Sequence, residues 1–174
     1  MGSFIFVIGG ARSGKSRYAS ELATKSGFEV TFIATADPND EEMKQRIEKH
    51  KASRPKEWKL IEENRNIDAV LSQKTSEHGL FLVDCLGLLI SNLMDGVLTD
   101  EMIEKKVDQV VGMINEKKLN VILVSNDVGS GIVPMNYSAR RFRDLIGLIN
   151  QKCARKADKV IFMQAGIPIV IKGE

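Results

Sequence analysis

One segment near the start of the chain limits its fold more than any other: Gly9-Gly10-Ala11-Arg12-Ser13-Gly14-Lys15-Ser16. It matches the P-loop pattern G-x-x-x-x-G-K-[ST] at every fixed position. The apolar run Phe4–Ile8 before it predicts a buried strand, and residues 17–23 after it carry apolar side chains at helical spacing. A P-loop requires this order of strand, loop and helix. The segment therefore predicts a phosphate-binding turn between a strand and a helix.

The residue types in this segment suit a triphosphate. Gly9 and Gly14 allow backbone N–H groups to curl around phosphate oxygens, and the N-terminus of the following helix adds partial positive charge. Lys15 is expected to reach the β- and γ-phosphates, and the Ser16 hydroxyl to hold Mg²⁺. We therefore expect the chain to bind a nucleoside triphosphate with Mg²⁺.

Length and composition describe an ordinary globular protein. A chain of 174 residues, 43% hydrophobic and 28% charged, fits a single domain with a substantial core. The net charge of +2, without a dense basic cluster, gives no reason to expect a nucleic-acid partner. Cys85 and Cys153 form no C-x-x-C pair and are expected to be buried free thiols. No apolar run reaches the length of a membrane span and no signal peptide is evident, so we expect a cytoplasmic protein.

Strands and helices alternate along the rest of the chain. The expected strands are Glu29–Thr35, Trp58–Glu62, Leu80–Asp84, Val121–Ser125, Val160–Met163 and Ile167–Ile171, and the expected helices cover about 40–52, 67–73, 86–94, 99–118 and 137–157. This alternation predicts an α/β fold with a mostly parallel central sheet flanked by helices. Pro168 favours an edge or strand-start position for the last strand, because proline cannot donate a backbone hydrogen bond, and we expect this strand at an edge of the sheet.

Two strand ends are candidates for the nucleotide site, because ligands of open α/β sheets bind beyond the carboxyl ends of the strands. Asp84 ends an apolar strand, which is the Walker B arrangement and predicts a second Mg²⁺ ligand. The small residues Ala34, Thr35 and Ala36 end the preceding long strand. The glycine-bearing loop 126–131 follows another.

The expected helix over 40–52 is highly charged and carries His50. A neutral imidazole can attack phosphorus, and the cations around His50 would attract a polyphosphate and disfavour the charged imidazole. A plain surface or interface histidine fits the same pattern. Arg140, Arg141 and Arg143 raise a separate question, because basic residues oppose the dipole in the first turn of a helix. They are expected to meet phosphates or a neighbouring subunit.

Several motifs in order resemble those of one family, the bifunctional adenosylcobinamide kinase / adenosylcobinamide-phosphate guanylyltransferases of cobalamin biosynthesis. The motifs are the P-loop at 9–16, Arg46–Lys51 with Arg54-Pro55 and Trp58, Asn126–Pro134, Arg141–Asp144, Asn150-Gln151 and Gly166–Lys172. The resemblance covers essentially the whole chain. It implies a P-loop NTPase fold of the RecA-like kind, with residues 1–174 as one kinase/guanylyltransferase domain.

The resemblance also implies two reactions. A phosphoryl group passes from ATP or GTP to adenosylcobinamide, and GTP then donates GMP to adenosylcobinamide phosphate through a guanylyl-histidine at His50. Lys15 is implied as the other catalytic residue, and the enzyme as a homotrimer. Nucleotide contacts are implied for Gly9, Gly10, Ala11, Arg12, Ser13, Gly14, Lys15, Ser16, Ala34, Thr35, Ala36, Lys51, Ala52, Ser53, Arg54, Glu62 and Asp84.

The chain departs from the family pattern at a few positions. Many members have glutamate where this chain has Asp84 and Asp127, and the shorter side chain can move a metal or water contact. Some members have two adjacent histidines where this chain has Lys49-His50, so His50 is the one nucleophile that the resemblance implies here. His78 lies in a polar turn and is expected to be a surface residue.

Two other functions remain open at this point. One is a small-molecule P-loop kinase without the guanylyltransferase step, which would make phosphorylated product but no covalent adduct. The other is a nucleotide-dependent switch whose loop 126–131 engages a partner protein. A switch would hydrolyse nucleotide slowly and would be indifferent to corrinoids.

Overall fold

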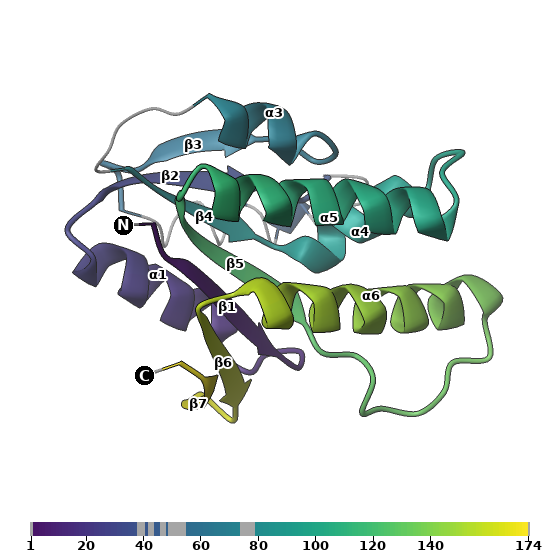
Figure 1. Cartoon of the computed structure of the whole chain (residues 1–174). Coiled ribbons are helices and arrows are strands. Elements are labelled where there is room, and N and C mark those ends of the chain that lie inside the picture. Colours follow the sequence, from purple (N-terminus) through teal and green to yellow (C-terminus); the bar gives the residue numbers. More distant parts are fainter. Residues whose placement is uncertain are drawn as a thin grey trace.

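A seven-stranded sheet runs through the protein in the order β3-β2-β4-β5-β1-β6-β7 (Figure 1). The computed structural model describes residues 2–37, 55–73 and 79–173, together with Glu41, Lys44, Gln45 and Glu48. The strands are β1 (Phe4–Gly9), β2 (Glu29–Ala34), β3 (Lys59–Glu62), β4 (Gly79–Asp84), β5 (Asn120–Asn126), β6 (Lys159–Gln164) and β7 (Ile167–Lys172). Each strand expected from the sequence is present, with ends that differ by a residue or two.

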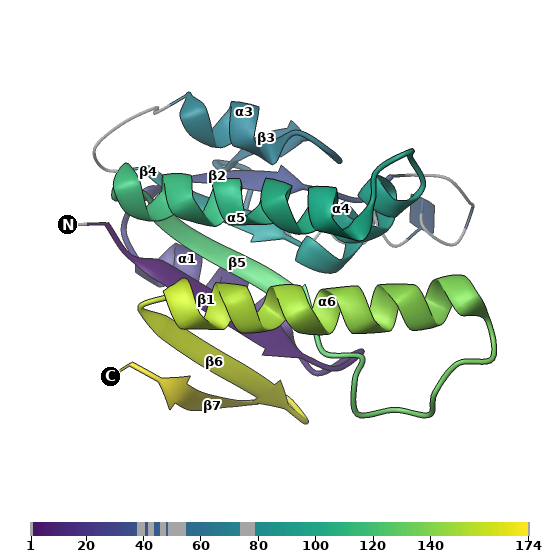
Figure 2. The same cartoon turned by 45° about the vertical axis from the view of Figure 1, so that its right-hand side comes forward.

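Helices cover both faces of the sheet, as Figures 1 and 2 show. They are α1 (Lys15–Lys25), α3 (Ile67–Ser72), α4 (Leu86–Met94), α5 (Asp100–Glu116) and α6 (Tyr137–Lys156). Buried residues of α3, α4, α5 and α6 share one apolar cluster with inward-facing strand residues such as Phe6 and Phe81. Buried residues of α1 belong to a second cluster, with Val7 and Ile122 from the other face of the same strands. Strands buried on both faces explain the continuous apolar runs in the sequence.

All pairings in the sheet are parallel except that of β6 with β7. The strand β7 is at the edge, as Pro168 predicted, and all six of its residues are exposed. Because it runs antiparallel, the chain returns to the edge of the sheet where the parallel strands begin. There Gly173 lies beside Asp158, and Gly2 at the other end of the chain lies beside Lys118.

The strand β5 lies between β1, which carries the P-loop, and β4, which ends at Asp84. This order and the helices on both faces confirm the predicted fold class, a mostly parallel P-loop sheet with a C-terminal edge strand. In the parts of the chain that the structure describes, no helix is long and apolar enough to cross a membrane.

Candidate active site

Four predicted site residues meet at the edge of the sheet where the parallel strands end. Gly9 pairs with Asn126 across β1 and β5, and Ala34 pairs with Asp84 across β2 and β4. On the other side of β2, Ala34 pairs with Glu62 at the end of β3. The parallel register therefore places the P-loop, Asp84 and Glu62 at one edge, where open α/β sheets bind their ligands.

The two fixed glycines of the P-loop are needed for different reasons. Gly14 has a φ of 92° and lies immediately before the first helical residue of α1, in a backbone region that residues with a Cβ rarely adopt. Gly9 has an ordinary φ, but a Cβ there would lie 2.6 Å from the Met163 carbonyl oxygen of β6 and 2.7 Å from Ser13 Oγ. Gly9 is thus required by the close approach of a neighbouring strand.

Lys15 lies at the start of α1 with its ammonium group turned back over the P-loop. Its Nζ donates a hydrogen bond to the Gly10 carbonyl at 3.0 Å. Burial lowers the pKa of Lys15 below its usual value, and the charges of Cys85 and Asp84 oppose that shift. The pKa of Cys85 is itself raised to about 12, chiefly by burial, so its thiol is neutral near pH 7. Asp84 is therefore the anion that acts on Lys15.

A magnesium site would draw on Ser16 and Asp84. Mg²⁺ prefers oxygen ligands, and it is usually held by one or two carboxylates together with substrate phosphates and water. The hydroxyl of Ser16 follows Lys15 in α1, and the carboxylate of Asp84 ends β4 near enough to act on the Lys15 charge. Within the described ranges no group of three or more acidic, histidine or cysteine side chains is placed to hold a metal. The donor set fits an ion shared with a nucleotide.

The hydroxyl of Thr35 forms hydrogen bonds with the backbone directly after β4. The Thr35 side chain is buried, and its Oγ1 donates to the Cys85 carbonyl at 2.7 Å and accepts from the Cys85 N–H at 2.8 Å. The Thr35 N–H also donates to the Asp84 carbonyl at 3.2 Å. The sequence suggested a nucleotide contact at Thr35 and did not predict this bond pair. Its neighbours Ala34 and Ala36 are half-buried.

The loop after β5 is hydrogen-bonded to the P-loop, and further hydrogen bonds join residues within the loop. The Asp127 N–H donates to the Gly9 carbonyl at 2.9 Å. The Asp127 carboxylate accepts from the Gly129 N–H at 3.1 Å and from Ser130 Oγ at 3.3 Å. Asp127 therefore has a local structural role, an Asx-type turn that shapes residues 127–130.

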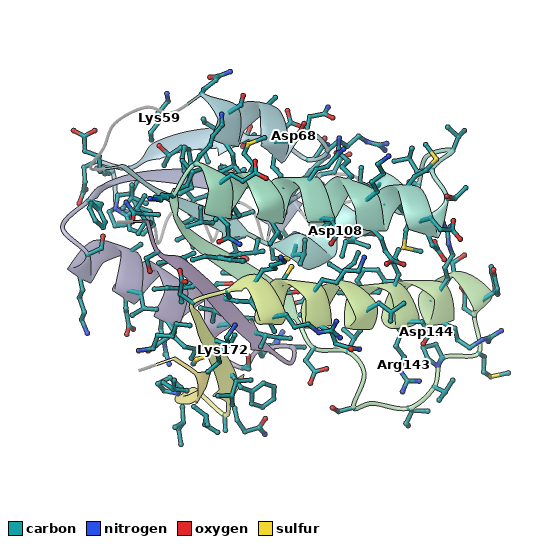
Figure 3. All side chains as sticks on the ribbon, in the orientation of Figure 1. Lys59, Asp68, Asp108, Arg143, Asp144 and Lys172 are labelled. Carbon is teal, nitrogen blue, oxygen red and sulfur yellow. The ribbon has the colours of Figure 1, made fainter. Side chains whose placement is uncertain are left out.

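The arginines at the start of α6 find their partners within the chain. Arg143, labelled in Figure 3, donates to the Gly129 carbonyl at 2.7 Å, and Arg140 donates to the Pro134 carbonyl at 3.0 Å. Arg141 donates to Asp100 Oδ1 at 2.7 Å. These bonds to backbone carbonyls and to one carboxylate explain why three basic residues begin this helix.

The turn between β6 and β7 contacts the P-loop, and the sequence did not predict this contact. The Gly166 N–H donates to the Ser13 carbonyl at 3.0 Å. Ala165 and Gly166 have φ values of 50° and 82°, the left-handed pair typical of a two-residue hairpin turn. The dipeptide Ala165-Gly166 between two apolar runs signals the hairpin, but nothing in the sequence shows where the hairpin packs.

Some predicted site residues lie outside the described residues. These are His50, the predicted nucleophile, and the predicted nucleotide contacts Lys51, Ala52, Ser53 and Arg54. Of the charged helix expected over 40–52, Glu41, Lys44, Gln45 and Glu48 are described, and all four are helical and exposed. Their roles stay predictions.

Residues 5–171 match the family model described as cobinamide kinase / cobinamide phosphate guanyltransferase. A bifunctional adenosylcobalamin biosynthesis protein, CobP of Pseudomonas aeruginosa, is 39% identical over 97% of this chain and 96% of its own length. The protein of the same description from Escherichia coli, CobU, is 34% identical over 97% of this chain and 99% of its own. Among solved structures, the RadB recombinase superposes with a TM-score of 0.52 at 12% identity, over 91% of this chain and 73% of that one.

Proposed function

Because the chain belongs to the cobinamide kinase / cobinamide phosphate guanyltransferase family, we propose that it catalyses both reactions in the family's description. It phosphorylates adenosylcobinamide with ATP or GTP. It then transfers GMP from GTP to adenosylcobinamide phosphate, which gives adenosylcobinamide-GDP and pyrophosphate. The observation that carries the proposal is the near full-length family match together with a complete P-loop beside Asp84 at the carboxyl edge of the sheet.

In the kinase step the hydroxyl oxygen of the aminopropanol arm attacks the γ-phosphorus. A new O–P bond forms, the bond to the β–γ bridging oxygen breaks, a nucleoside diphosphate leaves, and the proton of the hydroxyl is released. Lys15 and the N-terminus of α1 stabilise the negative charge on the phosphates. Bound Mg²⁺ would neutralise charge on the phosphate oxygens, and Ser16 and Asp84 are the residues that would hold it.

In the transferase step His50 is the nucleophile. An imidazole nitrogen attacks the α-phosphorus of GTP, an N–P bond forms, and pyrophosphate leaves as the α–β bridge breaks. A phosphate oxygen of adenosylcobinamide phosphate then attacks the same phosphorus, forms the diphosphate bridge and releases His50. Lys51, Ala52, Ser53, Arg54 and Glu62 contact the nucleotide near this histidine. Support for these roles comes from their positions in the family motif.

The P-loop anchors the polyphosphate for both displacements. Its nucleotide contacts are Gly9 to Ser16, supplemented at the neighbouring strand end by Ala34 and Ala36. Thr35 lies between these two alanines but is fully buried, and its hydroxyl, N–H and carbonyl are all bonded within the chain, so it supports the site without touching the nucleotide. One loop can serve both steps because it holds the phosphate chain while different phosphorus atoms are attacked.

The enzyme acts in the cytoplasm as a homotrimer. Support for an assembly comes from apolar side chains that are exposed on the single chain. They occur on β7 and in the loop before α6, where Ile132 and Met135 are almost fully exposed. Apolar surface of this kind marks interaction sites. Light scattering during gel filtration should give three times the mass of one chain, and a monomer at micromolar concentration would contradict this part of the proposal.

The covalent step is tested with GTP labelled at the α-phosphate. We expect the wild-type protein to carry an acid-labile, base-stable label, as a phosphoramidate does. His50→Ala should abolish the label, and His78→Ala, which changes the only other histidine in the chain, should keep it. Equal labelling of His50→Ala and wild type would contradict the assignment of the nucleophile.

The kinase step is tested with adenosylcobinamide and triphosphate labelled at the γ-phosphate. Lys15→Ala should lose both reactions, because the loop holds the nucleotide in each. Phosphorylated product without any covalent adduct in the wild type would identify an ordinary small-molecule kinase. Slow hydrolysis that corrinoids do not affect and a partner protein stimulates would identify a switch.

A further inference from the structure

Thr35 holds the backbone at the end of β4 from two sides. Its hydroxyl donates to the carbonyl of Cys85 and accepts from the N–H of the same residue, and the Thr35 N–H donates to the Asp84 carbonyl. Thr35 has no exposed surface. A buried hydroxyl that both donates and accepts fixes the backbone around it, and its loss would take this hydrogen bond from the N–H of Cys85.

Asn92 extends this arrangement from α4. Its Nδ2 donates to the Thr35 carbonyl at 2.8 Å and to the Asn64 carbonyl at 3.1 Å, so both amide hydrogens are used. Asn92 is 6% exposed in a helix whose other buried residues are leucine, isoleucine and glycine. A buried amide in an apolar helix costs free energy unless it is bonded, and here each hydrogen joins a different segment.

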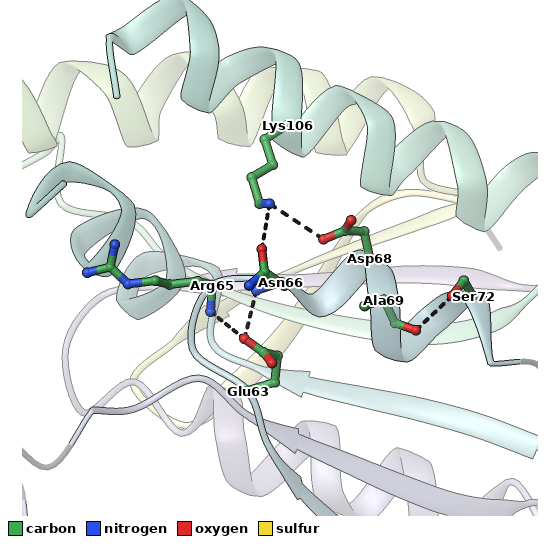
Figure 4. Close-up of polar contacts among 7 residues, drawn as sticks. All are labelled: Glu63, Arg65, Asn66, Asp68, Ala69, Ser72 and Lys106. Atoms are coloured by element: carbon green, nitrogen blue, oxygen red, sulfur yellow. Dashed lines mark hydrogen bonds and ion pairs between the residues drawn. The ribbon is translucent and has the colours of Figure 1, made fainter. Parts of the chain in front are cut away.

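The second segment, the loop after β3, is itself held in place. Asn64 Nδ2 donates to Asp37 Oδ2 at 3.2 Å. Figure 4 shows the rest of the loop: Glu63 Oε1 accepts from the N–H groups of Arg65 and Asn66, and Lys106 of α5 donates to Asn66 Oδ1 at 3.0 Å. The ends of β2, β3 and β4 are thus joined through Asn92 by polar bonds.

We propose that Thr35 and Asn92 are positioning residues for Asp84. This inference rests on the proposed function, in which Asp84 and Ser16 hold the magnesium ion of the nucleotide. The two residues fix the Asp84–Cys85 backbone, and through it the place of the Asp84 carboxylate relative to Lys15 and Ser16. A catalytic group that is displaced by about 1 Å loses about 100-fold in rate.

A purely structural role would give different results. If Thr35 only stabilised the core, its loss would lower the melting temperature and leave the magnesium dependence of nucleotide binding unchanged. If it positions Asp84, nucleotide affinity without metal stays near the wild-type value, and the gain in affinity on adding Mg²⁺ shrinks. These two readouts separate the roles without relying on turnover.

The test compares Thr35→Val with Thr31→Val. Both replace a buried threonine by an isostere without a hydroxyl, but Thr31 lies within β2, four residues before Thr35, which directly follows the strand. GDP binding is measured by calorimetry in EDTA and in Mg²⁺, and kcat and KM are measured for the kinase step. We expect Thr35→Val to lower kcat at least about tenfold and to remove most of the magnesium gain, with affinity in EDTA within about twofold of wild type. Thr31→Val should keep the magnesium gain and kcat within about twofold.

Further variants make the result decisive. Thr35→Ser keeps the hydroxyl and should recover most of what Thr35→Val loses. Asn92→Leu keeps a similar side-chain volume and removes both donors, and should reproduce the selective loss of the magnesium gain; it replaces Thr35→Val as the deciding variant if the latter fails to fold. A full magnesium gain in Thr35→Val, or an equal loss in Thr31→Val, would overturn the proposal. A wild-type protein that binds GDP with Mg²⁺ but does not phosphorylate adenosylcobinamide would overturn the proposed function and leave the positioning role of Thr35 and Asn92 intact.

Discussion

The backbone N–H of Gly166 donates a hydrogen bond to the carbonyl of Ser13 at 3.0 Å, and so joins the turn between β6 and β7 to the P-loop. The two segments are more than 150 residues apart in the chain. On its other side the P-loop is tied to the loop after β5, through the bond between Asp127 and Gly9. The phosphate-binding loop is therefore held by both of the strands that flank β1.

Gly166→Ala should weaken nucleotide binding through this contact. Gly166 has a φ of 82°, and an alanine in that region costs about 1–2 kcal/mol and tilts the turn. Gly27→Ala is the matched control, because Gly27 has a φ of 73° and lies beyond the end of α1, with open space around its Cβ position. Both variants should unfold at lower urea concentration. Only Gly166→Ala should lower GDP affinity, by at least about threefold in calorimetry. Equal affinities in the two variants would contradict the coupling.

Gly9→Ala and Gly10→Ala should differ in stability although they are neighbours. A Cβ at Gly9 would meet the Met163 carbonyl oxygen at 2.6 Å, whereas nothing lies within 4 Å of a Cβ at Gly10. Forcing a methyl group into a packed site costs about 1–3 kcal/mol. We expect urea denaturation to show this loss for Gly9→Ala and a change of less than about 0.5 kcal/mol for Gly10→Ala. Similar losses of stability in the two variants would mean that the contact with β6 is not the reason why position 9 needs a glycine.

Nucleotide affinity should fall at alkaline pH because of Lys15. Burial puts the pKa of Lys15 in the free protein below 10.5, and bound phosphates raise it, since they favour the ammonium form. At pH values between the pKa of Lys15 in the free protein and its pKa in the complex, GDP binding therefore takes up a proton. The affinity for GDP decreases as the pH rises through the lower of these two pKa values. The same lowered pKa makes the free protein more stable as the pH rises through it, because the unfolded chain binds more protons there.

Calorimetric titrations of GDP in buffers of different ionisation enthalpy measure this proton uptake. Lys15→Arg is the control, because a guanidinium stays charged throughout the accessible range. Its affinity, although lower, should not change with pH where that of the wild type falls. A wild-type affinity that is flat up to pH 10.5 would contradict the lowered pKa.

Neither cysteine should react in the folded protein. Cys85 and Cys153 are buried, and burial raises the pKa of each thiol to about 12. Thiolate is the reactive form, so almost none is present at pH 8. An aromatic disulfide reagent should label no thiol rapidly in the native state and two per chain in urea. Rapid labelling of one thiol in the native protein would show that its surroundings open.

Much of the fold could be predicted because it depends on local patterns. The apolar runs Phe4–Ile8 and Leu80–Val83 predicted buried strands, and Pro168 favoured an edge or strand-start position; β7 lies at the edge. The strand order could not be predicted, because it depends on pairings between distant segments. The insertion of β5 between β1 and β4 is such a pairing, and no local pattern encodes it.

The site was predicted in part for the same reason. The P-loop is a contiguous motif, and Asp84 is recognised by its place after a strand. The role of Asn92 was missed because its partners Thr35 and Asn64 are 57 and 28 residues away in the sequence, and its own surroundings look like a plain apolar helix. Arg140, Arg141 and Arg143 have partners within the chain, which the sequence did not indicate, and the expected contacts with phosphates or another subunit stay a prediction. His50 lies outside the described residues, and its role stays a prediction.

The antiparallel return of β7 has a practical consequence for handling the protein. Residues 2 and 173 lie beside Lys118 and Asp158, at the amino edge of the sheet, while the P-loop opens at the carboxyl edge. Figures 1 and 2 show both marked ends of the chain on one side. A purification tag or a surface tether at either end would therefore point away from the nucleotide. Immobilised protein should present its substrate-binding edge to solution whichever end is attached.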